Sequence, residues 1–520
     1  MKGLKSCVGS PPIATPQITR KRIQNDVNRS TELPDLPPST LPAHTIAVLK
    51  VDTHTGLPYI SEINMPGPAT NLAEAYARLK LEPLSDHSDD YVDLSAARGS
   101  KCLQRLESHL RASAINDDPR CHLAFIGHRG SGKSTELIRM EERLSDTFFP
   151  IHLYVDDRLQ RDADYPDLFL WLVESIEQHL EKAGIHFPPK HADEVANWFR
   201  EVTKFETHKT EQSTSLGTEA KASAGVSFFG TGLKLIAQLK SAIVGSRETR
   251  TEMRKEVKKR PEEFITLVNN FIHAAAAAVV AAGKPGKLLV VQDNLDRLDR
   301  DAALQLFQVN GENLKRLDIA CVWTPPVGSL LSPFNIGLVF PHFPMPMISV
   351  RKRDGKTNPA AIAGLIALME KRLSIASTFA APGLVKELIL ASGGSIREFI
   401  RLTADARLNA DVDSHGRIEK SDIKTAIKDC ALQLQNSFYP SNVYFPILAS
   451  IYLHKEFRAD LGAELSTAAV DARRHFYHSL IAEEAVFAYN GDANWEDVHP
   501  SLHVLDDFKK AVAALPPIAS

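Results

Sequence analysis

The sequence predicts an α/β fold in which helices flank a parallel sheet, followed by an all-helical region and a small mixed domain. Three observations lead to this fold class. From about residue 121 onward, short apolar segments alternate with long helical patterns, as they do in a parallel sheet covered by helices. A glycine-rich stretch follows the first of these strands, and a later strand ends in acidic residues. Both motifs stand where the carboxyl ends of parallel strands meet.

Composition limits the class of protein. The chain has 520 residues, too many for a single core, and its 43% hydrophobic and 24% charged residues are ordinary for a globular protein. A net charge of -3 gives no overall attraction to nucleic acid or anionic membranes. The five scattered cysteines fit a reducing cytoplasm, and the apolar run 271–283 is shorter than the roughly 20 residues of a membrane-spanning helix. We therefore expect a cytoplasmic protein without a membrane partner.

Changes in composition divide the chain into regions. Five strands of one sheet are expected at 122–126, 150–155, 287–293, 319–324 and 345–350. The predicted regions are a disordered tail (1–42), a lead-in hairpin and helix (43–95), an α/β core (96–356) with a flexible insert at about 205–232, a helical lid (357–435) and a winged-helix-like domain (436–520).

The glycine-rich stretch "GHRGSGKS", Gly127 to Ser134, matches the Walker A pattern at every specified position. Its glycines permit backbone conformations in which successive N–H groups converge on phosphate oxygens at a helix N-terminus. Lys133 adds a positive charge for the outer phosphates, and the Ser134 hydroxyl is a ligand for Mg²⁺. The residues expected to bind the nucleotide are Gly127, His128, Arg129, Gly130, Ser131, Gly132, Lys133, Ser134 and Thr135.

The acidic stretch "KLLVVQDNLDRL" supplies the second element that a phosphate loop needs. Four apolar residues lead to Asp293, which we expect to hold Mg²⁺ together with Ser134. Asp296 follows after a turn. A strand that ends in a solvated acidic turn is the alternative for this stretch taken alone.

Together the two motifs resemble the P-loop ATPases of the AAA+, STAND and KAP groups, and the Asp–x–Leu–Asp–Arg run is most like KAP. The resemblance covers residues of about 96 to 435 and implies ATP and Mg²⁺ as cofactors. In such proteins the first acid is followed by a second, which is tied to the activation of water. This chain has Asn294 there, and an amide cannot accept a proton as a carboxylate does. We therefore expect slow or absent hydrolysis, with Asp296 as a possible substitute base.

The resemblance also implies two residues that respond to the terminal phosphate. Thr324 ends the predicted strand 319–324, and Arg397 lies in "SGGSIREFIRL" at the start of a lid helix. The alternatives are an ordinary strand threonine and a solvated helix arginine. No arginine stands between Thr324 and Val350, where AAA+ rings usually carry the finger for a neighbouring subunit. Arg351 and Arg353 are possible substitutes.

Two segments are candidate contacts for DNA or another subunit. Arg250, Arg254 and Lys258 recur at spacings of four on a predicted helix, which is also typical of a solvated helix with internal ion pairs. Near the C-terminus, a predicted hairpin across Asn490-Gly491 follows a helix and resembles a winged helix. Its basic residues are available for DNA, and its aromatic residues equally for packing. The basic candidates are Arg473, Arg474, His475 and His478.

These features favour an ATP-binding, slowly hydrolysing switch. By resemblance it would form homo-oligomers, act through a separate effector protein and serve in bacterial stress or antiphage defence. One alternative is an origin-recognition-like ATPase that binds DNA. The other is a nucleotide-bound scaffold without turnover, which Asn294 leaves open.

Overall fold

The computed structural model describes residues 49–51, 58–60, 67–85, 87–156, 158–159, 161–204, 231–331, 334–438, 441–459, 466–490 and 494–515. The predicted tail and nearly all of the predicted insert lie outside these ranges. The chain divides into two units, Met1–Met65 and Pro66–Ser520. In the first unit, β1 (Leu49–Val51) and β2 (Pro58–Ile60) pair antiparallel.

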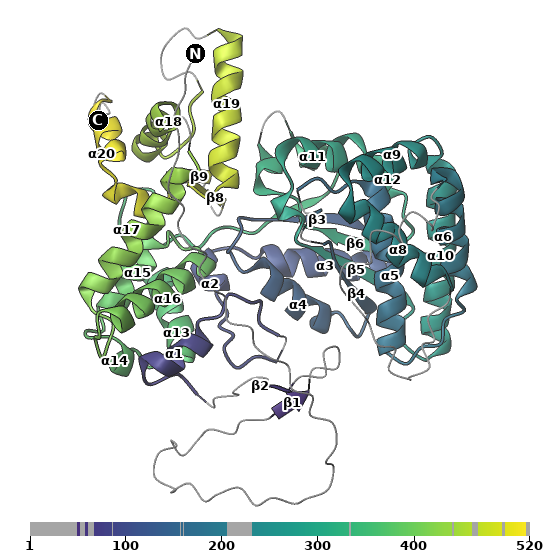
Figure 1. Cartoon of the computed structure of the whole chain (residues 1–520), viewed down its shortest axis with the longest axis horizontal. Coiled ribbons are helices and arrows are strands. Elements are labelled where there is room, and N and C mark those ends of the chain that lie inside the picture. Colours follow the sequence, from purple (N-terminus) through teal and green to yellow (C-terminus); the bar gives the residue numbers. More distant parts are fainter. Residues whose placement is uncertain are drawn as a thin grey trace, which may run out of the picture. The chain divides into compact units, whose positions relative to one another are not determined.

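The second unit contains the predicted parallel sheet (Figure 1). Its order is β4-β5-β6-β3-β7, and every neighbouring pair is parallel. The strand that precedes the glycine-rich loop therefore lies next to β6, which separates it from the strand that ends in Asp293. The strands are β3 (His122–Ile126), β4 (Phe148–Tyr154), β5 (Lys287–Asp293), β6 (Ala320–Trp323) and β7 (His342–Pro344).

The fifth strand differs from the prediction, which placed it at 345–350. The chain leaves the sheet after Met345, whose N–H donates to Ile126 O at 2.6 Å, and the next residue, Pro346, has no N–H to continue the ladder. The apolar residues that predicted a strand are buried elsewhere. Met347 packs with aromatic residues of the C-terminal hairpin, and Ile348 packs in the lid core. An apolar run predicts burial without specifying which core it joins.

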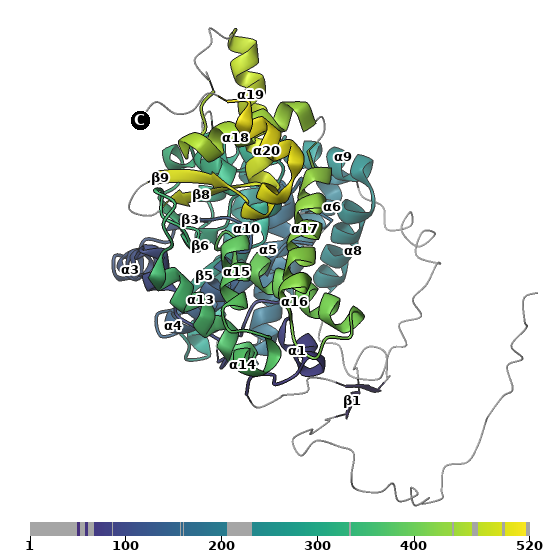
Figure 2. The ribbon, with the colours of Figure 1, turned by 90° about the vertical axis from the view of Figure 1, so that its left-hand side faces the viewer.

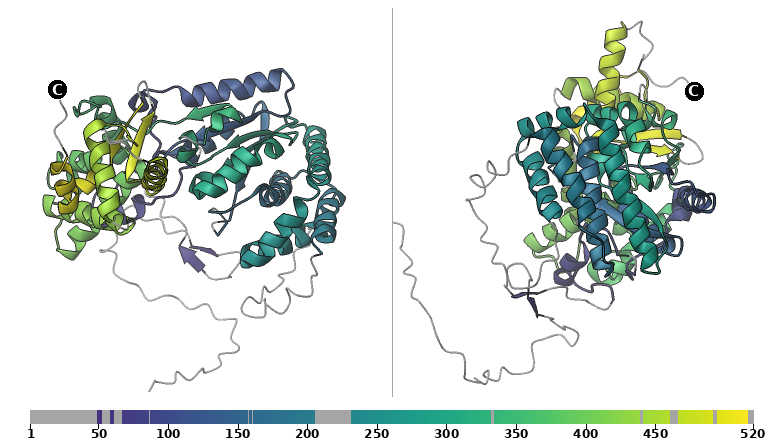
Figure 3. Two further views of the ribbon diagram at one scale, coloured as in Figure 1. Left: turned by 90° about the horizontal axis from the view of Figure 1, so that it is seen from above. Right: turned by 90° about the vertical axis from the view of Figure 1, so that its right-hand side faces the viewer.

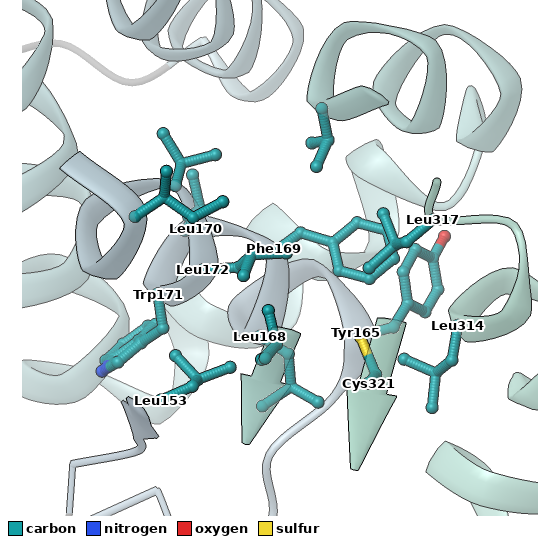
Figure 4. Close-up of a cluster of buried hydrophobic side chains, with 14 of the residues drawn as sticks. Leu153, Tyr165, Leu168, Phe169, Leu170, Trp171, Leu172, Leu314, Leu317 and Cys321 are labelled. Carbon is teal, nitrogen blue, oxygen red and sulfur yellow. The ribbon is translucent and has the colours of Figure 1, made fainter. Parts of the chain in front are cut away.

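Helices cover both faces of the sheet (Figure 3). Alternate residues of each strand point to opposite faces, so Leu123 and Leu289 pack with α3 and α4, while Ala124 and Val290 pack in the larger core on the other face. Figure 4 shows part of this larger core, where consecutive leucine and aromatic side chains of α5 meet the end of the sheet. The core helices are α3 (Cys102–Ile115), α4 (Lys133–Arg143), α5 (Tyr165–Lys182), α6 (Lys190–Thr203), α8 (Thr231–Gly245), α9 (Arg247–Val257), α10 (Pro261–Ala281), η1 (Leu295–Arg297), α11 (Arg300–Leu304), η2 (Gln305–Val309), α12 (Gly311–Lys315), η3 (Val327–Leu330) and η4 (Ile336–Leu338).

Helix α10 is, in the described part of the chain, the one helix long and apolar enough to cross a membrane by length and composition alone. Its apolar residues, among them Phe264, Val268 and Phe271, are buried in the large core. A core helix of a folded domain passes the same test.

The segment 357–435, predicted as a helical lid, contains a series of helices with their own core. Two helices from before β3 join it, because α1 contributes Leu72 and Ala75 to the lid core and Ala69 N donates to Arg372 O at 2.8 Å. This part of the predicted lead-in region (43–95) therefore packs in the lid core. The helices are α1 (Leu72–Arg78), α2 (Ser95–Arg98), α13 (Pro359–Arg372), α14 (Ile375–Thr378), α15 (Leu384–Ala391), α16 (Ile396–Val412) and α17 (Lys420–Asn436).

The C-terminal region combines helices with the predicted antiparallel hairpin (Figure 2). Tyr477, Phe487 and Tyr489 are buried, so the aromatic residues of this region serve packing. Its elements are α18 (Ser441–His454), α19 (Thr467–Ala482), β8 (Val486–Asn490), β9 (Asn494–Val498), η5 (Pro500–Val504) and α20 (Asp506–Ala513).

Candidate nucleotide-binding site

The glycine-rich loop connects the end of β3 to the start of α4, as the sequence predicts. Gly130 and Gly132 have φ values of +71° and +96°, where side chains are strained. A Cβ on Gly130 would also lie 2.6 Å from Ser395 Oγ, so the lid approaches the loop too closely for any other residue. The loop therefore has the strand–loop–helix form that presents backbone N–H groups to phosphate.

Lys133 and Asp296, both predicted site residues, are brought together at this loop. Lys133 Nζ lies 2.7 Å from Asp296 Oδ2 and donates to the carbonyl oxygens of Gly127 and His128 at 2.8 and 2.9 Å. Burial alone would raise the pKa of Asp296, but the charge and hydrogen bond of Lys133, together with the charges of Arg129 and Arg397, lower that pKa. Asp296 is thus an ionised partner that holds the Lys133 ammonium group.

Asp293 is the last residue of β5, Asn294 follows it, and their side chains have different roles. Asp293 is buried, and its Oδ1 accepts from Asn294 N at 2.8 Å. Asn294 adopts φ +69°, and its amide Nδ2 donates to Val155 O at 2.7 Å while its Oδ1 accepts from Val155 N at 3.1 Å. This side chain ties β5 to the end of β4. Asparagine tolerates this left-handed conformation better than most residues, which is the signal that sequence reasoning missed.

An ion pair beneath the loop was also missed. Arg98 at the end of α2 is 6% exposed, and its Nη2 donates to Ser131 O at 2.6 Å. Its Nη1 lies 3.5 Å from Glu136 Oε1 on α4. Burial lowers the pKa of Arg98 and raises that of Glu136, while the pairing opposes both shifts. No local pattern indicates this contact, because Arg98 precedes the loop by about thirty residues on a four-residue helix.

A cleft of about 800 Å³ opens beside the loop. The loop contributes the polar residues Lys133, Ser134 and Thr135, and η1 adds Asp296. The lid and the segment before α2 contribute a largely apolar lining, to which the lid adds Arg372 and Arg397. This division fits a nucleotide, whose phosphates need the polar loop and whose base needs apolar walls. The apolar lining comprises Leu81, Pro83, Leu84, Val92, Leu94, Leu368, Ile396 and Ile400.

The two predicted sensors lie in different surroundings. Thr324 is fully buried, and its N and Oγ1 both lie 3.4 Å from Gln292 Oε1 on β5. Arg397 lies at the loop, because its N–H donates to Gly130 O at 3.2 Å and its side chain lines the cleft. The lid arginine is thus positioned beside the phosphate loop, and the threonine contacts the strand that carries Asp293.

His128, a variable position of the loop, contacts the C-terminal region. Its Nε2 accepts from the N–H of Ala488 on β8 at 2.8 Å, and its ring packs edge-on against Phe487. Burial lowers the pKa of His128 to about 3, with Lys133 acting in the same direction, so the ring is neutral and can accept this hydrogen bond. Arg129 beside it donates from Nε to Asp296 O at 3.5 Å.

The basic ridge on α9, predicted as a possible DNA contact, is occupied by acidic residues of the same chain. Arg250 lies 2.9 Å from Asp162, Arg254 lies 2.5 Å from Asp167, and Lys258 pairs with Asp164. The ridge therefore fixes α9 to the start of α5 through ion pairs within the chain, and a DNA contact through these three residues stays a prediction. Local spacing identified the ridge but not its partners, which lie about ninety residues away.

Two of the four basic candidates of the C-terminal helix have partners within the chain. Arg473 donates to Ala459 O at 3.2 Å, and Arg474 lies 3.6 Å from Asp471. Of the suggested substitutes for a finger arginine, Arg351 donates to Gly355 O at 3.5 Å and Arg353 lies 3.9 Å from Glu456.

The sheet, the glycine loop and the acidic end of β5 together define a P-loop nucleotide-binding fold. A scan against protein-family models and a search of curated proteins find no match. Among solved structures, a Walker-type ATPase of Pyrococcus abyssi is 13% identical with a TM-score of 0.38, covering 82% of this chain and 99% of its own.

Two other solved structures have similar values. Cdc6p of Pyrobaculum aerophilum is 13% identical with a TM-score of 0.33, covering 82% of this chain and 97% of its own. The ORC1 protein of Aeropyrum pernix, in complex with DNA, is 14% identical with a TM-score of 0.32, covering 84% and 96%. TM-scores this low do not establish a shared fold, so the fold class rests on the strand order and the loop geometry.

Proposed function

We propose that this protein is a Mg²⁺-dependent, ATP-binding switch of the AAA+/STAND/KAP type that hydrolyses ATP slowly. The observation that carries the proposal is that two other regions bond directly to the phosphate loop. Arg397 N of the lid donates to Gly130 O, and Ala488 N of the C-terminal hairpin donates to the ring of His128. A ligand that rearranges this loop must act on both regions, which is what a switch requires.

The residues of the site fit this ligand. The N–H groups of the glycine loop and Lys133 would hold the phosphates, and Ser134 and Asp293 would hold Mg²⁺, which neutralises phosphate charge when bound. Lys133 is already enclosed by oxygen acceptors, so phosphate oxygens would replace the partner that Asp296 now provides. The amide of Asn294 is bonded to β4 and accepts no proton, which supports slow turnover.

Retention of labelled ATP by the purified chain tests the proposal. We expect Mg²⁺-dependent retention by the wild type and its loss in Lys133→Ala, with Lys182→Ala, an exposed lysine on α5, as the matched control. Thermal unfolding of each variant verifies that it is folded. Equal retention by Lys133→Ala and the wild type, or none in the wild type, would refute the proposal.

The same preparation separates the alternatives. The switch predicts a change of oligomer mass with ATP alone. A rate of phosphate release that rises with double-stranded DNA would favour an origin-recognition-like ATPase, and tight binding with zero turnover would favour a scaffold. A role in stress or antiphage defence, with a separate effector, remains what the resemblance implies.

A further inference from the structure

A second cavity, of about 920 Å³ and open to solvent, lies beyond the phosphate loop. Four arginines from four separate elements line it: Arg129 of the loop, Arg161 before α5, Arg297 of η1 and Arg397 of α16. We call it the arginine cavity. Its remaining lining is the turn between α19 and β8, residues 482–484. Four guanidinium groups that converge on one space form a site for an anion with several oxygens, such as a phosphate.

The carboxylate of Glu484 now stands in this cavity. Its Oε1 lies 4.0 Å from Arg397 Nη1, which is an ion pair at the limit of contact, and this enclosed oxygen accepts no hydrogen bond among the described residues. Burial raises the pKa of Glu484 to about 7, although Arg397 and Arg129 lower it. The Oε1 atom of this carboxylate is thus enclosed without a close partner, so the group is held loosely.

The backbone at Glu484 is also unusual. Helix α19 ends with Glu484 N donating to Ile481 O and Ala485 N donating to Leu480 O, and Glu484 itself has φ +60°. Glycine is the usual residue in this left-handed position at a helix end. A glutamate in this conformation is strained, and its carboxylate lies in a cavity where it lacks close bonds.

The phosphate loop and the arginine cavity adjoin each other. Arg129 belongs to both, Arg397 lines both the cleft and the cavity, and Glu484 also lines a pocket with Gly127 and Asp296. A triphosphate held by the loop would extend its last phosphate toward these guanidinium groups, whereas a diphosphate is one phosphate shorter. The site therefore provides a means to distinguish the two nucleotides.

We propose that Glu484 is an internal competitor of the terminal phosphate: it occupies the arginine cavity without nucleotide, and the γ-phosphate of a bound triphosphate displaces it. Phosphate binds guanidinium through two parallel hydrogen bonds, a geometry that Glu484 does not achieve. The displacement moves the turn that leads into β8, the strand bonded to His128. This inference rests on the proposed ATP site. It adds that Glu484 is the residue through which the protein distinguishes a bound triphosphate from a bound diphosphate.

Calorimetric titration with a non-hydrolysable ATP analogue and with ADP, both with Mg²⁺, tests the competitor. In Glu484→Gln the affinity for the analogue should rise about fivefold or more, and that for ADP should stay within about twofold. The control is Glu252→Gln, which removes the same charge from an exposed residue of α9 outside the cavity and should leave both affinities within about twofold. A similar rise for both nucleotides, no change for either, or the same effect from Glu252→Gln would overturn the inference.

Arg161→Gln gives an independent test that does not depend on the stability of the Glu484 variant. Removal of this guanidinium should lower the affinity for the analogue and leave that for ADP unchanged. Equal losses for both nucleotides would contradict the inference. A wild type that binds neither nucleotide would refute the ATP site itself, whereas normal binding with an unchanged ratio of affinities in both variants would refute the competitor alone.

Discussion

Asn294 shows that one residue can have a structural role that its place in a motif does not indicate. By position it replaces a carboxylate that activates water, and its amide indicates that the usual general base for hydrolysis is absent. In the structure the side chain makes two hydrogen bonds to Val155, in a left-handed conformation that asparagine favours. Its orientation toward β4 makes it a structural link between two strands of the sheet.

Restoring a carboxylate at this position should not restore fast hydrolysis. In Asn294→Glu we expect no increase in the rate of phosphate release, because the side chain is directed to β4. We also expect a loss of about 2 to 4 kcal/mol in the free energy of unfolding, since Val155 N and O lose their partner. Urea unfolding and a phosphate-release assay measure the two effects, with Asn116→Glu at the exposed end of α3 as control. A faster rate would show that position 294 faces the nucleotide.

The residues that sequence reasoning found are those whose signal is local. Gly130, Gly132 and Lys133 lie within one motif, and their conformations and contacts follow from it. Arg98 and Glu484 also reach the loop, but they come from segments about thirty and more than three hundred residues away. No spacing in the sequence encodes such a contact, because it depends on how separate elements pack.

At the scale of elements, α9 also shows that spacing in the sequence does not identify the partners of a side chain. Its four-residue spacing of basic side chains is genuine, but the sequence of a helix does not say whether a charged ridge meets solvent, DNA or another helix. The start of α5 decides this, since Asp167 is fully buried and also caps that helix. Burial raises the pKa of Asp167, and Arg254 opposes the shift. The ion pairs of the ridge therefore stabilise the α/β core.

Arg254→Ala should cost about 3 to 5 kcal/mol in the free energy of unfolding at pH 7, because it leaves a buried carboxylate without its partner. The loss should shrink toward pH 5. The raised pKa of Asp167 favours its neutral form in the folded state, and that form needs no cation. Urea unfolding at both pH values measures this, with Arg247→Ala on the exposed side of α9 as the matched control. Equal stability of the two variants would mean that the ridge is not a packing contact.

At the scale of the whole molecule, residues 66–520 form one unit in which the phosphate loop meets both the lid and the C-terminal hairpin. Glycines allow this close approach. A Cβ on Gly393 would lie 2.7 Å from the ring of Phe487, and Tyr489 Oη donates to Gly393 O at 2.7 Å. The lid, the loop and β8 are therefore packed as one assembly around the nucleotide cleft, so a change at the loop is transmitted by direct contact.

Amide hydrogen exchange with and without MgATP tests most directly whether the phosphate loop is coupled to the lid and to the C-terminal hairpin. Binding should change the exchange of peptides that cover 396–398 in the lid and 484–490 in the hairpin, because the N–H groups of Arg397 and Ala488 bond to the loop. Peptides of α9 should not change, and Lys133→Ala should abolish the whole effect. Protection confined to residues 127–135 in a protein that binds ATP would contradict the account, since nucleotide would then be held without reaching the lid or the hairpin.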